Sequence, residues 1–138
     1  MPARKSFDYA LIRVVPLVER GEFINAGAIL YCRAAAVLEA RLALDRTRLA
    51  ALAPWVPADE IQAHLDAIPL ICAGVAEASP IARLSQSERF HWLVAPRSTV
   101  IQTSPVHSGM TANPAAALDH IMATLVLPPE GPLPQPLA

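Results

Sequence analysis

Three polar side chains near the amino terminus are of types that could hold an anion or move a proton. Arg20, Glu22 and Asn25 flank or follow Gly21, which can take the positive φ of a turn. Asparagine is depleted in strand interiors, and Gly27 would let a ligand or a backbone come close. These residues predict either a binding site or a solvated hairpin tip at which Asn25 bonds a neighbouring backbone group.

A second group of polar side chains lies between residues 91 and 108. Arg97 is followed by the hydroxyls of Ser98 and Thr99, and His107 comes later in the segment. An arginine followed by two hydroxyls resembles an anion-binding loop, because the guanidinium fork fits carboxylate and phosphate oxygens. The alternative is that Arg97 caps the edge of a sheet and pairs with a carboxylate.

The two groups form one polar site if the fold brings them together, since loops held by a rigid scaffold often carry functional side chains. In that hypothesis Arg97 binds an anionic group and Glu22 orients it or acts as a base. Asn25 and His107 then supply hydrogen bonds. The phosphate-binding, dinucleotide-binding, HExxH and GxSxG patterns are missing from the sequence, and its histidines are not at metal-ligand spacing. We therefore expect no metal and no cofactor.

Alternating side chains predict the strands that must position these residues. Phe7–Val15 and Phe23–Arg33 are apolar on both faces and flank the turn at residues 20–22, which predicts a hairpin with an internal second strand. Val37–Leu44 has one polar face and suits a sheet edge. Thr99–Ser104 is rich in β-branched residues and predicts a fourth strand.

Helical periodicity predicts the elements that pack on this sheet. Ala58–Ala78 carries an apolar stripe, and Pro69 is expected to kink it. Pro114–Val126 begins after an N-cap at Asn113 and has a full apolar face. The sequence also predicts shorter helices at residues 45–53 and 87–94. The expected fold class is α+β, with an antiparallel β-sheet of about four strands packed against two or more helices.

Length and composition indicate one domain in a cytoplasmic protein. Of the 138 residues, 1–127 are expected to form the α+β domain, and 128–138 a proline-rich disordered tail. A net charge of −1 makes nucleic-acid binding an unfavoured function. The amino terminus has no signal-peptide core, and the longest charge-free apolar run is about half of a membrane span. Cys32 and Cys72 are expected to be reduced and buried, with a disulfide as the alternative.

Longer motifs give the chain a family resemblance. It resembles a bacterial family known as domain of unknown function 3037 (DUF3037) from about Tyr9 to Val126, in a consistent order of motifs. The matching residues are Tyr9, Arg13, Val15-Pro16, Glu19 to Gly27, Leu30, Cys72-Ala73-Gly74, Arg89 to Leu93, Ala95 to Thr99, Gln102, Ser104 to His107, Gly109 and Asn113-Pro114.

The resemblance implies no established activity. Members of the family are often encoded beside HipA-like kinases, which implies a binding or regulatory role next to such a kinase. The two-sided apolar strands add a physical argument: two main helices that cover one face of the sheet would leave a patch for a second copy or another protein. The competing hypothesis is a small enzyme that acts on a phosphate ester with Glu22, Arg97 and His107. The polar residues decide between them: convergence in one pocket favours the enzyme.

Overall fold

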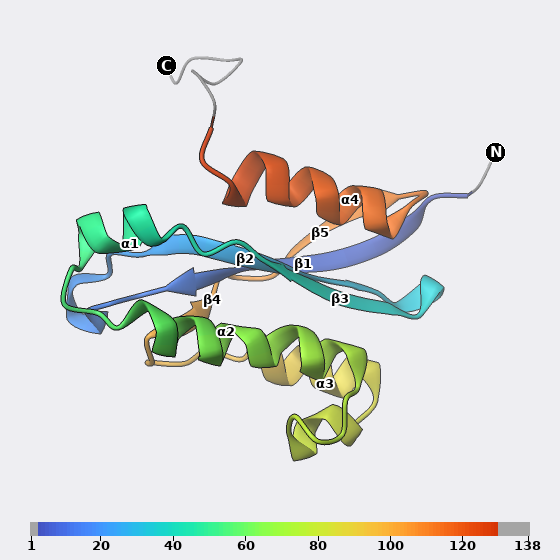
Figure 1. Cartoon of the computed structure of the whole chain (residues 1–138). Helices are drawn as coiled ribbons and strands as arrows, with labels where there is room; N and C mark the ends of the chain where they lie inside the picture. Colours follow the sequence, from blue (N-terminus) through green and yellow to red (C-terminus); the bar gives the residue numbers. More distant parts are fainter. Residues whose placement is uncertain (1–2, 130–138) are drawn as a thin grey trace.

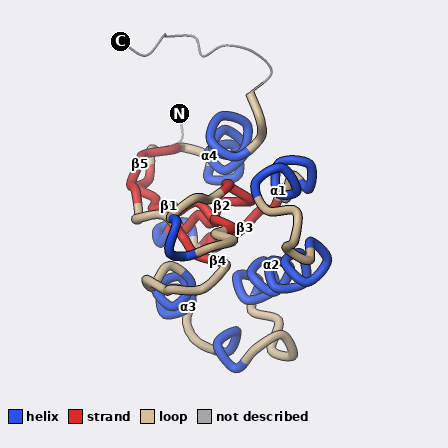
Figure 2. Tube along the Cα trace, turned by 90° about the vertical axis from the view of Figure 1, so that its left-hand side faces the viewer, coloured by secondary structure: helices blue, strands red, loops and turns tan. Residues whose placement is uncertain are grey.

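The computed structural model describes residues 3–129 and is an antiparallel sheet between two helical layers (Figure 1). α4 lies on one face of the sheet, and α2 and α3 lie on the other, as the view along the sheet also shows (Figure 2). The expected α+β class is confirmed. The elements are β1 (Lys5–Val14), β2 (Ile24–Cys32), β3 (Val37–Leu42), α1 (Arg46–Leu52), α2 (Ala58–Ala73), α3 (Gln86–Leu93), β4 (Ile101–Thr103), β5 (His107–Thr111) and α4 (Pro114–Ile121), which continues as a π-helical turn (Met122–Val126).

The sheet has the strand order β3-β2-β1-β4, and β5 pairs with the same edge of β1 as β4 does. β4 lies along the end of β1, and β5 along its beginning. Ser104 lies between them: its hydroxyl accepts a hydrogen bond from the Leu11 N–H at 2.8 Å, and its own N–H donates to the Leu11 carbonyl at 2.8 Å. β5 was not expected, because its side chains are mostly exposed and show no apolar alternation. It forms because β1 is long enough to pair with two short strands.

β1 and β2 are apolar on both faces because each face supports its own core. The face toward α2 and α3 buries Ile12, Val14 and Ile29, with Leu65 and Phe90 from the helices. The opposite face buries a second cluster against α4: Phe7, Ala28, Leu30, Cys32, Leu118, Ile121, Met122 and Val126. The internal position of β2 is confirmed. The expectation that the two main helices share one face is wrong, so the sheet itself does not supply the uncovered patch.

α2 is shorter than the sequence indicates. It ends at Ala73, not Ala78, because Gly74 takes the left-handed conformation with φ 75° and reverses the chain. The guanidinium of Arg89, which is 9% exposed, donates to the Ile71 and Cys72 carbonyls at 2.9 and 2.7 Å. It also donates to the Leu84 carbonyl at 3.1 Å. Arg89 therefore satisfies the end of α2 and fixes the chain that leads to α3.

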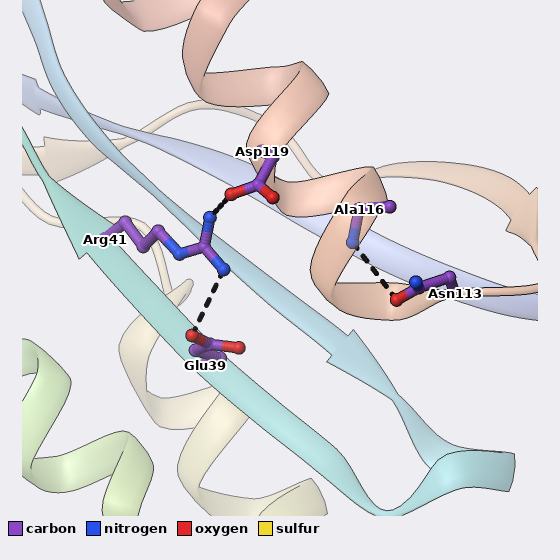
Figure 3. A network of polar contacts seen from close by, with 5 residues as sticks. All are labelled: Glu39, Arg41, Asn113, Ala116 and Asp119. Atoms are coloured by element: carbon purple, nitrogen blue, oxygen red, sulfur yellow. Dashed lines mark hydrogen bonds and ion pairs between the residues drawn. The ribbon is translucent and has the colours of Figure 1, made fainter.

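α4 is held at its start and along its side. Asn113 is the expected N-cap, and its side-chain oxygen accepts from the Ala116 N–H at 3.2 Å (Figure 3). Arg41 on β3 pairs with Asp119 on α4 and reaches Glu39 at 3.5 Å (Figure 3). This network ties the helix to the edge strand on the far side of β2.

The two cysteines lie in different cores, Cys32 beneath α4 and Cys72 on the opposite face, and both are free. The expected buried thiols are confirmed. Burial raises the pKa of Cys72 to about 12, which keeps this thiol protonated and unreactive. In residues 3–129, no helix is long and apolar enough to cross a membrane. Most of the expected tail, residues 130–138, lies outside the described part of the chain.

Candidate functional site

Several loops meet at one end of the sheet, which we call the hairpin end (Figure 1). It contains the β1–β2 loop at residues 15–23, α1, and the α3–β4 loop at residues 94–100. The Val15 N–H donates to the Val100 carbonyl at 2.6 Å, so the first and third of these segments are in contact. The loops that carry most of the predicted site residues therefore share one end of the molecule.

The first part of the hairpin end is a cleft between the β1–β2 loop and α1. It has a volume of ≈ 380 Å³, and its lining includes Arg20, Glu22, Leu17 and Trp55. Arg20 and Glu22 form an exposed ion pair with each other. The hydrogen bond from Arg20 lowers the pKa of Glu22 below its usual value. Glu22 is therefore a poor general base near neutral pH.

The second part is a cavity of ≈ 440 Å³ between α2, α3 and β4. Its walls are mainly apolar and include Ile61, Ile68 and Trp92. Arg97 and Thr99 also line it, but the Thr99 hydroxyl donates to the Ile101 carbonyl at 2.8 Å. The cavity thus has the size of a small-molecule site. The Thr99 hydroxyl, however, already uses its proton in a bond within the protein.

Arg97 is held by the end of α3. One terminal nitrogen donates to the Leu93 carbonyl at 2.9 Å and reaches the Ala95 carbonyl at 3.5 Å, and the other donates to the Trp92 carbonyl. Its guanidinium carbon lies 4.5 Å from the centre of the Trp92 ring. The alternative hypothesis for Arg97 is not supported, because Arg97 caps a helix and pairs with no carboxylate of the described chain.

Asn25 lies at the third part of the hairpin end, under the π-helical turn. Its amide nitrogen donates to the Leu125 carbonyl at 3.0 Å, while its buried side-chain oxygen has no partner in residues 3–129. Arg13, its partner across the β1–β2 ladder, has a buried Nε atom that also lacks a partner. The guanidinium carbon of Arg13 lies 4.1 Å from the centre of the exposed Phe23 ring.

The remaining candidates lie at the surface. Ser98 is exposed in the α3–β4 loop, and His107 is exposed on β5, where its ring stacks on Tyr9 with centroids 5.4 Å apart. The structure brings Arg20 and Glu22 together in one cleft, and Arg97 and Thr99 in one cavity. It does not bring Glu22, Asn25, Arg97 and His107 into one pocket.

Sequence reasoning missed Arg13 and Trp55. Arg13 had a visible signal, because it is the one charge in the apolar run from Tyr9 to Val14 of β1. Trp55 is an aromatic residue between Pro54 and Pro57, where a connection between helices is expected to be exposed. In residues 3–129, no group of three or more His, Cys, Asp or Glu side chains could hold a metal ion.

Comparison with known proteins gives one match. The model of a family described as "Protein of unknown function (DUF3037)" matches residues 9–126, which run from β1 to the end of the π-helical turn. No curated protein and no solved structure matches the chain.

Proposed function

We propose that this chain, which belongs to the DUF3037 family, is a protein-interaction module that binds a partner protein through the hairpin end. The observation that carries the proposal is a set of large apolar side chains left exposed at this end or on the adjoining π-helical turn and its exit. Their exposed fractions range from 39 to 63%, and they are Leu17, Val18, Phe23, Trp55, Leu125 and Leu127.

Such a set is unusual on a surface that only faces water. Scattered apolar residues are common on protein surfaces, but grouped ones with a polar rim are typical of binding sites. Tryptophan and arginine are enriched among the residues that dominate binding energy. Trp55 is the most exposed large apolar side chain of the described chain at 63%, and it lines the same cleft as Arg20.

The scaffold beneath these side chains is suited to presenting them. β1 and β2 pair over seven positions beside the hairpin loop. The loop itself turns through a 3₁₀ segment, Val18–Arg20, that ends at Gly21 with φ 68°. A loop held by a rigid sheet presents its side chains at low entropic cost on binding.

The geometry gives less support to the alternative, a small enzyme that acts on a phosphate ester. That reaction needs Glu22, Arg97 and His107 on one substrate, and these residues lie in separate environments. Arg97 already donates to the end of α3, and Glu22 already pairs with Arg20. Convergence of these residues in one pocket was the feature expected to favour the enzyme, so their separate positions favour an interaction module.

The partner class that we propose is a cytoplasmic protein, with a HipA-like kinase first among the candidates because of the family association. A second copy of this chain is the other candidate. In either complex, Trp55 and Phe23 are expected to enter the partner's surface, because exposed aromatic side chains bury large apolar areas at little entropic cost.

The test compares three forms of the chain in capture experiments from native lysate, followed by mass spectrometry and then by binding measurements with the purified partner. Trp55→Ala should abolish capture, while Met110→Ala should keep it, because Met110 is 58% exposed but lies on β5. Sedimentation of the wild type and of Trp55→Ala covers the second-copy case. A strictly monomeric wild type, together with partners that bind Trp55→Ala as tightly as wild type, would overturn the proposal.

A further inference from the structure

Arg13 is one of two charged side chains on a face of β1 that is otherwise apolar, and the other, Lys5, lies at the far end of the strand. Strand alternation places Arg13 on the same face as Phe7, Tyr9 and Leu11, which pack in the core beneath α4. Arg13 lies at the hairpin end of this face, beside the π-helical turn that contacts Asn25. The position is partly buried.

Its neighbours on both adjacent strands are polar. Arg13 is opposite Asn25 on β2 and opposite Gln102 on β4. Directly paired residues of antiparallel strands project to the same side of a sheet. Asn25, Arg13 and Gln102 therefore form a polar row across three strands, which we call the Arg13 row.

The hydrogen bonds of the Arg13 row are incomplete. Asn25 donates to the Leu125 carbonyl at 3.0 Å, and Gln102 donates to the Thr99 carbonyl at 2.8 Å. The Nε of Arg13 and the side-chain oxygen of Asn25 are both buried without a partner in the described part of the chain. Buried polar atoms in folded proteins are nearly always paired, so each exception calls for an explanation.

The charge of Arg13 is also uncompensated within residues 3–129, where no carboxylate pairs with it. The Phe23 ring covers one side of the guanidinium and shields that side from water. A partly desolvated guanidinium is best satisfied by a carboxylate, which accepts two parallel N–H bonds from the fork.

We propose that the Arg13 row receives an aspartate or glutamate side chain of the partner protein. The carboxylate accepts from the terminal nitrogens of the Arg13 guanidinium beside Phe23. The inference rests on the proposed function, because Phe23 and Leu125 belong to the same exposed apolar set.

The surroundings select a protein carboxylate over other anions. Nucleic acids and anionic membranes are bound by several clustered cations, whereas the row contains one cation in a chain of net charge −1. A single arginine amid exposed apolar side chains matches an acidic side chain that lies within an apolar protein surface.

The first test needs no identified partner. In protein labelled with ¹⁵N-arginine, the Nε–H signal of Arg13, assigned by its loss in Arg13→Gln, is followed by NMR during titration with glutarate. We expect a saturable shift with a dissociation constant of about 10 mM or less, and none with neutral glutaramide. Tighter binding of inorganic phosphate than of glutarate, or no saturable shift, overturns the inference. The inference is also overturned if glutarate binds Glu130→Gln but not the wild type. That result would mean that the carboxylate of Glu130 in this chain occupies the Arg13 row.

The second test uses the partner that the capture experiment identifies. Arg13→Gln should weaken binding by about 30-fold or more, because a desolvated charge of the partner would lose its counterpart. Arg33→Gln removes the same charge next to the opposite end of β2 and should leave the affinity unchanged. If Trp55→Ala abolishes binding while Arg13→Gln does not change it, the hairpin end is the interface and the Arg13 inference is wrong. If neither substitution matters, both are wrong.

Discussion

The α2–α3 face of the sheet and the hairpin end of its α4 face hold their arginines in opposite ways. On the face that α2 and α3 cover, Arg89 and Arg97 donate to the carbonyls at the ends of those helices. On the α4 face, Arg13 stacks on Phe23 and leaves a buried donor unused. An arginine whose donors are used by the backbone stabilises the fold, whereas one with unpaired terminal nitrogens is available to a ligand. The difference is in hydrogen bonding, which depends on the positions of the backbone carbonyls in the fold.

The strongest test of this comparison is Arg89→Met. The substitution leaves the carbonyls of Ile71, Cys72 and Leu84 without their buried donor. We expect it to lower the free energy of unfolding by about 3–5 kcal/mol, because three hydrogen bonds from a buried guanidinium are lost together. Urea denaturation measures the change. Arg83→Met is the control: Arg83 is exposed, and its loss should change stability by less than about 0.5 kcal/mol.

Arg97→Met should have the next largest effect. Its guanidinium is only partly buried and donates to fewer well-placed carbonyls than Arg89, so we expect a loss of about 1–3 kcal/mol in the free energy of unfolding. Partner binding measured well below the denaturation midpoint should be unchanged. Ser98→Ala, at an exposed neighbour, should leave stability unaffected. Lost binding with unchanged stability would instead favour the anion-binding hypothesis for Arg97.

Arg13→Met should change stability least among the three arginines. The substitution removes an unpaired buried donor, which favours folding, and a cation–π contact with Phe23 worth about 0.5–1 kcal/mol, which opposes it. We expect the free energy of unfolding to stay within about 1 kcal/mol of wild type. A loss as large as that of Arg89→Met would mean that Arg13 is a structural residue, and the two faces would no longer differ.

Much of the fold could be predicted because local signals and tertiary structure agree. Alternation located β1, β2 and β3, and Asn113 with Pro114 located the start of α4. The end of α2 could not be placed, because the apolar stripe continues to Val75 while Gly74 reverses the chain. β5 was missed because its strand conformation depends on the free edge of β1 and not on its own side chains.

The site was harder to predict, because its chemistry depends on which donors the backbone has already used. Arg97 resembles an anion-binding residue in the sequence, and only the position of the α3 carboxyl end shows that its terminal nitrogens are occupied. One of the two sequence hypotheses had Asn25 bond a neighbouring backbone group, yet its partner is the Leu125 carbonyl, 100 residues away. Arg13 could have been singled out by its charge alone, since burial of a cation on a strand demands either a partner or a function.

The smallest expected effect is at the hairpin loop, where the Arg20–Glu22 pair is exposed to solvent. The hydrogen bond from Arg20 holds the pKa of Glu22 below its usual value of about 4.3. A lowered pKa in the folded state means that the pair stabilises the protein above that usual value, and that this contribution is lost as pH falls through the lower, folded-state pKa. Glu22→Gln should therefore lower the melting temperature slightly at pH 6 and not at pH 3, with the difference at pH 6 shrinking at high salt. If the difference in melting temperature between wild type and Glu22→Gln is as large at pH 3 as at pH 6, Glu22 acts by packing in the cleft beside Trp55. Arg20 would then be, like Arg13, an arginine at the hairpin end whose charge is not stabilised by a carboxylate.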